Sequence, residues 1–222
     1  MAGYGLALSP RVSPEAAARI LAERVPVMAK LVAAAGPIQL RPPLESHFAF
    51  LVRAITYQQL AGAAAAAIHG RLVAALDGNV APEALLELPD EALRAAGLSA
   101  AKMASLRDLA TKSLDGTVVL DPKSLRAESD QEVITRLTAV RGIGEWTAHM
   151  FLIFQLRRLD VWPTGDLGVR RGYGLAWGIP TPTAKELGPL GEELRPYRTV
   201  AAWYCWRAAE IYGGAVDSAV TR

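Results

Sequence analysis

The amino-acid sequence predicts an all-α globular protein. Apolar residues recur at helical spacing along most of the chain, and glycine, proline and serine separate the segments that they form. Alternation of apolar and polar residues, which marks a half-buried strand, is confined to a few residues near 117–120. The 222 residues are 51% hydrophobic and 21% charged, which excludes a disordered chain and allows a sizeable core.

The first half of the chain is predicted to hold a series of short helices. Residues 1–12 are expected to be loosely structured, and Ser13-Pro14-Glu15 predicts a helix start with the serine as N-cap. Pro26 breaks or kinks this helix, which ends at Gly36-Pro37. Further helices are expected over residues 44–57, along the alanine-rich run from 61, and over 82–88, 90–96 and 99–114.

The second half is predicted to hold helices around a glycine-containing bend. Asp130 is expected to cap the helix that enters the bend, and a second apolar helix leaves it and runs through Phe154. A short helix is expected from Asp166 to about Gly174, another over residues 181–194 with an interruption at Gly188-Pro189, and a last long helix over 198–212.

The bend itself, Val140-Arg141-Gly142-Ile143-Gly144, is the first candidate binding motif. Its two glycines allow a sharp turn and a close approach to a partner, because neither has a Cβ atom. The amides of the bend and of the next helical turn lack internal acceptors and lie at the positive end of a helix dipole. They could bind an anion such as a phosphodiester. The alternative is a tight turn between two helices with no ligand.

Charge, cysteine and histidine usage exclude several classes of site. The net charge of +2 does not by itself indicate a nucleic-acid partner, although eight arginines are concentrated in the second half: Arg141, Arg157, Arg158, Arg170, Arg171, Arg195, Arg198 and Arg207. The single cysteine, Cys205, excludes an internal disulfide and is expected to be buried. The three histidines have no zinc-site spacing, and no signal or membrane segment begins the chain, so a cytoplasmic protein is expected.

The bend and the residues after it resemble the helix–hairpin–helix DNA glycosylases. Their signature is a V-x-G-I-G-x-W-T-A hairpin, found here at residues 140–148, followed by a Gly/Pro-rich turn, Trp162-Pro163-Thr164-Gly165, and the aspartate Asp166. The sequence is most similar to the bacterial 3-methyladenine DNA glycosylase II group, and the resemblance covers residues 40–210. It implies two helical lobes with a DNA-binding, active-site cleft between them: residues 1–43 with 156–222, and residues 44–155.

The resemblance assigns the catalytic role to Asp166, whose carboxylate would stabilise the positive charge that develops on the sugar as the N-glycosidic bond breaks. An aspartate at a helix start can also be only an N-cap. Relatives that cut the DNA backbone carry a nucleophilic lysine two positions after the second hairpin glycine, and Trp146 stands there in this chain. Water is therefore the expected nucleophile, without lyase activity.

The resemblance also implies a base pocket and a DNA-binding surface. Trp146 and Trp206 would line or support the pocket, in which Met150 replaces a stacking tyrosine of the family. Leu60 would be the wedge that fills the gap left by an extruded base, with Gln59 as its polar neighbour. The hairpin contacts to a DNA phosphate would come from Gly142, Ile143, Gly144 and Thr147, and the backbone carbonyls of Thr138, Val140 and Ile143 would hold Na⁺ or K⁺.

The sequence thus predicts a monofunctional glycosylase that flips and excises alkylated purines of the 3-methyladenine and 7-methylguanine type from double-stranded DNA. No cofactor is expected to be required, and a single cysteine cannot ligate a four-cysteine iron–sulfur cluster. Nothing indicates an oligomer or a membrane partner, so we expect a monomer. The alternatives are a non-catalytic DNA-binding module and a glycosylase for deaminated or oxidised bases, which the Met150 replacement leaves open.

Overall fold

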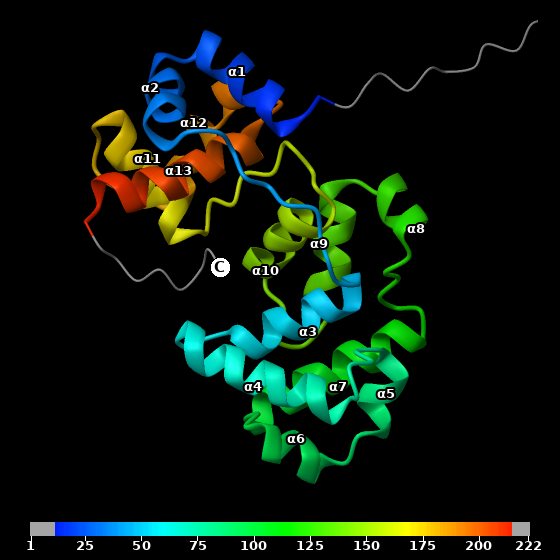
Figure 1. The fold of residues 1–222 in the computed structure, drawn as a ribbon. Coiled ribbons are helices and arrows are strands. Elements are labelled where there is room, and N and C mark those ends of the chain that lie inside the picture. Colours follow the sequence, from blue (N-terminus) through cyan, green and yellow to red (C-terminus); the bar gives the residue numbers. More distant parts are fainter. Residues whose placement is uncertain (1–11, 215–222) are drawn as a thin grey trace, which may run out of the picture.

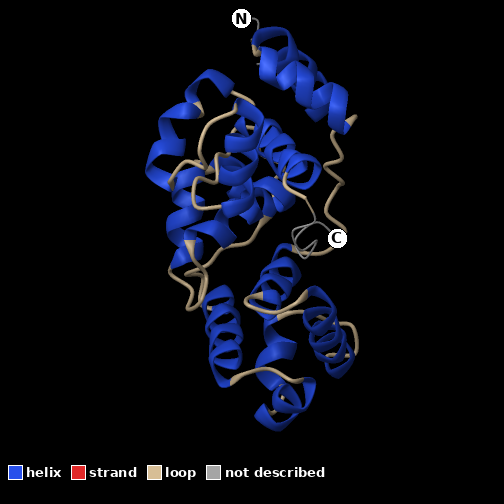
Figure 2. Cartoon of the chain, turned by 90° about the vertical axis from the view of Figure 1, so that its left-hand side faces the viewer, coloured by secondary structure: helices blue, strands red, loops and turns tan. Residues whose placement is uncertain are grey.

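The computed structural model describes residues 12–214, and within this range it contains helices and loops but no strand (Figure 2). The predicted all-α class is therefore confirmed. Most of the loosely structured segment predicted at residues 1–12 lies outside the described residues, as do residues 215–222. No helix in the described part of the chain combines the length and apolarity needed to cross a lipid bilayer.

Two N-terminal helices replace the single broken helix that the sequence allowed. The Ser13 hydroxyl accepts a hydrogen bond from the amide of Ala16 and caps α1 (Pro14–Arg24). Helix α2 (Pro26–Ala35) begins at Pro26, so the proline separates two helices, as its missing N–H and fixed φ favour.

The central part of the chain contains six helices. The bounds of the first five agree with the predicted segments to within a few residues: α3 (His47–Tyr57), α4 (Gly62–Ala75), α5 (Pro82–Glu87), α6 (Asp90–Ala96) and α7 (Ala100–Leu114). The sixth helix, α8 (Pro122–Ala127), was not predicted, although Asp121-Pro122 is a helix-start signal. The Asp121 carboxylate accepts a hydrogen bond from the Ser124 amide at 2.9 Å.

The bend lies between α9 (Asp130–Thr138) and α10 (Glu145–Met150), which continues as the π-helix η1 (Phe151–Gln155). The prediction that Asp130 caps α9 is wrong. Ser129 is the N-cap, because its hydroxyl and the Glu132 carboxylate bond each other's backbone amides in a capping box.

The last helices are α11 (Leu167–Trp177), α12 (Ala184–Leu190), the 3₁₀ helix η2 (Glu192–Leu194) and α13 (Arg198–Tyr212). Contrary to the prediction, α12 continues through Gly188-Pro189. A proline near the end of a seven-residue helix removes little hydrogen bonding, and α12 ends at Leu190, with Gly191 as its C-cap.

The helices form two groups that are discontinuous in sequence (Figure 1). Helices α1, α2, α11 and α13 contact one another, whereas α3 contacts α4, α7 and η1. Buried apolar side chains run through both groups as one core. Helices α11 and α13 cross closely, because a Cβ atom on Gly172 would lie 1.7 Å from the carbonyl oxygen of Cys205.

Candidate active site

The Asp166 side chain is held at the N-terminus of α11. The preceding turn closes when the Asp166 amide donates to the carbonyl of Pro163 at 2.9 Å. Asp166 is the N-cap of α11, and its Oδ1 atom accepts a hydrogen bond from the Val169 amide at 2.8 Å. The residue is only 6% exposed, so this carboxylate is buried at the positive end of a helix dipole.

Trp206 supports the same carboxylate from α13. Its indole Nε1 donates to Asp166 Oδ1 at 2.9 Å, and its ring stacks on Phe154 with an interplanar angle of 20°. A Cβ atom on Gly168 would lie 2.9 Å from Trp206 Cδ1, so a glycine is needed for this approach. Trp206 is 9% exposed and is therefore fixed by its surroundings.

Trp146 approaches Asp166 from α10. Its indole Nε1 donates to Asp166 Oδ2 at 2.6 Å, while 41% of the residue remains exposed. Met150 lies one helical turn further along α10 and is buried. The structure thus brings together Asp166, Trp146 and Trp206, three of the four residues predicted for catalysis and the base pocket, in direct hydrogen-bond contact.

These contacts join the two groups of helices. Trp146 comes from α10 beside the bend, whereas Asp166 and Trp206 come from α11 and α13 of the other group (Figure 1). Cys205 precedes Trp206 and is fully buried, as predicted, and burial together with the nearby Asp166 raises the pKa of its thiol. The thiol is therefore protonated and inert.

The bend adopts the predicted tight hairpin. Gly142 has a φ of +77°, and a Cβ atom there would lie 2.6 Å from Ser105 Oγ, so both its conformation and its surroundings require glycine. Among the described residues, the amides of Gly142 and Gly144 donate no hydrogen bond. Thr147 is buried in the following helical turn. The hairpin therefore offers two backbone donors to an external acceptor.

The three carbonyls proposed to hold a monovalent cation surround the same hairpin. Val140 accepts a hydrogen bond from the Ile143 amide at 3.1 Å. Within the described part of the chain, the carbonyls of Thr138 and Ile143 accept none, so they retain lone pairs for a ligand.

The loop between α3 and α4 lies against the hairpin. Gln58 Nε2 donates to the carbonyl of Gly142 at 2.8 Å. The next residue, Gln59, is exposed with a φ of +57°, a conformation that L-residues adopt at a cost and that is frequent at functional loops. Leu60 is 37% exposed, so its side chain is accessible to a partner.

Sequence reasoning missed two residues that build this region. The sequence predicted a role for Gln59 and none for Gln58. It is the side-chain amide of Gln58, however, that connects the loop to the hairpin by a hydrogen bond. Phe154 was identified only as an apolar helix position, and its stacking on Trp206 depends on how α13 packs. Neither role has a local sequence signal, because each partner lies far away along the chain.

Four of the eight arginines noted in the second half of the chain, Arg158, Arg195, Arg198 and Arg207, form ion pairs. Arg158 contacts Asp130, Arg195 and Arg198 contact Asp160, and all of these carboxylates lie within 3.0 Å of their partners. Arg141, on the hairpin, forms no ion pair among residues 12–214. Arg157, Arg170 and Arg171 likewise form none within this range, so arginines without an ion pair are not confined to the hairpin.

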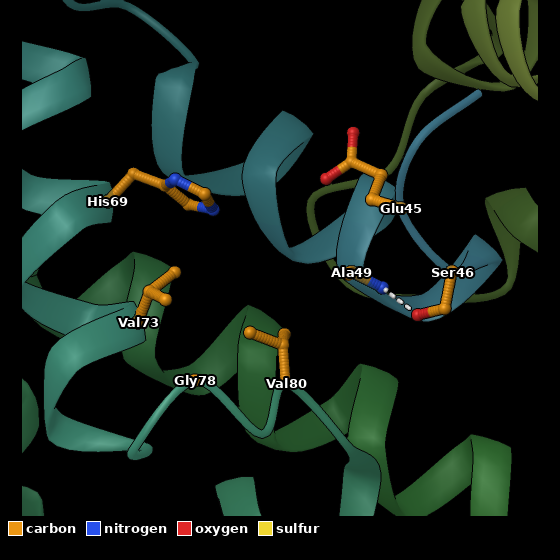
Figure 3. Close-up of a pocket in the computed structure, with 7 residues that line it drawn as sticks. All are labelled: Glu45, Ser46, Ala49, His69, Val73, Gly78 and Val80. Atoms are coloured by element: carbon orange, nitrogen blue, oxygen red, sulfur yellow. Dashed lines mark hydrogen bonds between the residues drawn. The ribbon is translucent and has the colours of Figure 1, made fainter. Parts of the chain in front are cut away.

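Two cavities are lined by residues other than Trp146, Asp166 and Trp206. The larger, about 290 Å³, is lined by Glu45, Ser46, Ala49, His69, Val73, Gly78 and Val80, with His69 facing it from α4 (Figure 3). The smaller, about 180 Å³, lies beside His149 and Trp162. No cluster of three or more His, Cys, Asp or Glu side chains within the described range could hold a metal ion.

An all-helical fold, a hairpin with free amides and a buried carboxylate between two helical groups define a helix–hairpin–helix protein with a single acidic centre. The chain belongs to the HhH-GPD superfamily of base excision DNA repair proteins, whose sequence model matches residues 52–196. The expected superfamily is therefore confirmed.

One sequence relative and one solved structure extend the comparison. DNA-3-methyladenine glycosylase 1 of Schizosaccharomyces pombe is 38% identical over 164 residues, which are 72% of this chain and 72% of the relative. The crystal structure of a DNA-3-methyladenine glycosidase from Bacillus halodurans superposes with a TM-score of 0.80 at 38% identity, covering 90% of this chain and 91% of that one.

A third comparison includes a nucleic acid. The structure of a Schizosaccharomyces pombe 3-methyladenine DNA glycosylase in complex with abasic DNA superposes with a TM-score of 0.76 at 33% identity. The superposition covers 90% of this chain and 99% of that protein. The same fold thus binds abasic DNA in that protein.

Proposed function

We propose that this protein is a monofunctional DNA glycosylase that excises alkylated purines from double-stranded DNA. The observation that carries the proposal is the buried Asp166 carboxylate, which lies where the hairpin-bearing helices meet α11 and α13. The relatives named as 3-methyladenine glycosylases support the substrate class.

The carboxylate supplies the charge that the reaction needs. Loss of the base leaves an oxocarbenium-like sugar, and a preorganised anion beside it stabilises that cation without reorganisation of solvent. A base methylated at N3 or N7 is already cationic and leaves readily. Trp146 and Trp206 provide indole rings next to Asp166 that can bind such a base by stacking and cation–π contact, worth about 0.5–2 kcal/mol each.

Water completes the reaction in this proposal. Trp146 occupies the position at which related enzymes with lyase activity carry a lysine, and the sequence has no lysine between Lys123 and Lys185. Without an amine near the sugar no Schiff base forms, and the product is an abasic site. Borohydride added during turnover is expected to trap no covalent protein–DNA complex, and a trapped band on a denaturing gel would contradict hydrolysis.

The hairpin and the loop before α4 would bind the DNA. The free amides of Gly142 and Gly144 suit a phosphate, and the carbonyls of Thr138, Val140 and Ile143 suit a bridging Na⁺ or K⁺. Gln59 and Leu60 are the exposed residues that would fill the gap of a flipped base. In this arrangement residues 44–155 form one lobe, residues 1–43 with 156–222 form the other, and a monomer suffices.

A panel of lesions tests the substrate class. Duplexes with a single 3-methyladenine, 7-methylguanine, hypoxanthine, ethenoadenine or uracil are incubated with the protein and heated in alkali, which cleaves the strand at abasic sites. We expect cleavage at the two methylated purines. Cleavage only at the deaminated bases would shift the assignment to another specificity, and DNA binding without any excision would leave a non-catalytic module.

A pair of glycine variants tests DNA binding by the hairpin. Gly144→Ala places its Cβ in open space, so the fold should remain intact while the methyl group hinders a phosphate at the hairpin. We expect weaker binding of duplex DNA, measured by fluorescence anisotropy, with an unchanged melting temperature. Gly188→Ala also meets no neighbour and lies away from the hairpin, so it should leave affinity unchanged. Equal affinities of the two variants would exclude this contact.

A further inference from the structure

The three hydrogen bonds to the Asp166 carboxylate differ in how firmly their donors are held. Val169 and Trp206 both donate to Oδ1, the first from the backbone of α11 and the second from a buried ring stacked on Phe154. Trp146 alone donates to Oδ2. The residue is 41% exposed, and its ring stacks on no other aromatic ring in the described residues. Trp146 is therefore the donor that is free to move.

The two oxygens of Asp166 consequently have different roles. Both lone pairs of Oδ1 are engaged by fixed donors, so Oδ2 is the oxygen left to face a deoxyribose. In the free protein Trp146 covers Oδ2 through a short, charge-assisted bond of 2.6 Å, which withdraws negative charge from this atom and places an indole beside it.

We propose that Trp146 is a gate on the catalytic carboxylate: its indole N–H covers Asp166 Oδ2 in the free protein and leaves that oxygen only when a flipped base binds the indole face. The proposal rests on the proposed function. It gives Trp146 a positioning role that acts through Asp166, in addition to its place in the wall of the base pocket.

The gate favours cationic bases. When the indole turns away, it loses a hydrogen bond to a carboxylate, and contact with the base has to offset that loss. A positively charged methylated purine gains both stacking and cation–π attraction, whereas a neutral base such as hypoxanthine gains stacking alone. Asp166 Oδ2 is therefore uncovered more readily when a cationic base is bound. This selects cationic over neutral bases before the glycosidic bond breaks.

Indole NMR resonances test the movement directly. The protein has five tryptophans, so the ¹⁵N-labelled Trp146 and Trp206 indole signals can be assigned from single Trp→Phe variants. We expect a downfield Trp146 N–H signal in the free protein that moves upfield in Asp166→Ala. The probe is a duplex with 7-methylguanine on a 2′-fluoroarabinose, whose fluorine suppresses cleavage. Binding should shift the Trp146 signal upfield and leave that of Trp206, and an unmoved Trp146 signal in the saturated complex overturns the gate.

Kinetics of Trp146→Phe test the consequence for specificity. Phenylalanine keeps an aromatic face but has no N–H, so Oδ2 is uncovered for every base. We expect the ratio of single-turnover rates, hypoxanthine over 7-methylguanine, to rise about tenfold, the lower end of what loss of a charge-assisted bond permits. Trp203→Phe is the matched control on α13, because Trp203 forms no hydrogen bond with Asp166, and its ratio should not change.

The outcomes separate the gate from the function on which it rests. An unchanged ratio in Trp146→Phe, or an equal fall in both rates, means that the N–H stays bonded during the reaction and overturns the gate. Failure of the wild-type protein to excise 7-methylguanine contradicts the proposed glycosylase instead.

Discussion

Replacing Asp166 with asparagine removes the charge from the candidate site with almost no change in shape. The asparagine carbonyl oxygen can still accept the hydrogen bonds from Val169 and Trp206 at 2.8 and 2.9 Å, so the cap of α11 is retained. The amide NH₂ then takes the place of Oδ2 and faces the indole N–H of Trp146, which now lies 2.6 Å from an acceptor. The indole N–H of Trp146 therefore loses its hydrogen-bond acceptor.

Two effects of different size follow from this geometry. Loss of one hydrogen bond to a charged group lowers the free energy of unfolding by about 1–3 kcal/mol. Loss of a preorganised charge beside the oxocarbenium raises the barrier by about 2.7–4 kcal/mol, which is a rate reduction of about 10²–10³-fold. The loss of unfolding free energy is smaller than the about 5–15 kcal/mol by which domains are typically stable, so the variant should stay folded at room temperature and the rate effect should be measurable without interference from unfolding.

The assay is single-turnover excision of 7-methylguanine, with abasic sites revealed by alkali, alongside anisotropy measurements on an uncleavable duplex. Asp121→Asn is the matched control, since Asp121 also caps a helix, accepting from Ser124 at 2.9 Å, but lies on α8. We expect Asp166→Asn to bind DNA and to excise slowly, and Asp121→Asn to behave as wild type. A rate for Asp166→Asn within about threefold of wild type would refute the catalytic assignment.

Two further predictions concern stability. Gly172→Ala should lower the free energy of unfolding by about 3 kcal/mol or more in urea titrations, because its Cβ would lie 1.7 Å from the carbonyl oxygen of Cys205. Gly70 lies in α4 with open space around it, so Gly70→Ala should instead raise the free energy of unfolding by about 0.5–1 kcal/mol. A lower free energy of unfolding in both variants would contradict the packing argument. Burial lowers the pKa of His69 and of His149, so the unfolded chain binds more protons and stability should fall as the pH drops below about 6.5. Changing both histidines to glutamine should make the urea midpoint of unfolding less dependent on pH between pH 7.5 and 5. An unchanged pH dependence would show that other groups cause the loss of stability.

The sequence predicted the helices best where a local signal defines their ends. Ser13-Pro14 places the start of α1 correctly, because a hydroxyl cap and a proline act on neighbouring amides. The same signal at Asp121-Pro122 was overlooked, and at α9 the choice of Asp130 over Ser129 was wrong by one residue. Caps act over three residues, so a one-residue error changes the identity of the cap but not the existence of the helix.

The candidate site was predictable in part for a different reason. Gly142 could be singled out because two glycines one residue apart allow a tight hairpin, and its φ of +77° agrees with this. Asp166 was identified through the family resemblance, because its position at a helix start would by itself suit an ordinary N-cap. The contacts of Gln58 with Gly142 and of Phe154 with Trp206 connect residues that are 84 and 52 positions apart. No local pattern encodes such contacts.

The sequence by itself determined the helical class, the hairpin and the residue types that can stabilise a sugar cation, because periodicity, caps and glycines act over a few residues. Only the tertiary structure decided that Trp146 and Trp206 donate to opposite oxygens of one carboxylate. That arrangement depends on the close crossing of α11 and α13 at Gly172 and on the position of α10 across from them. Hydrogen bonds between distant segments form only when packing brings donor and acceptor within about 3 Å, and packing is a property of the whole core.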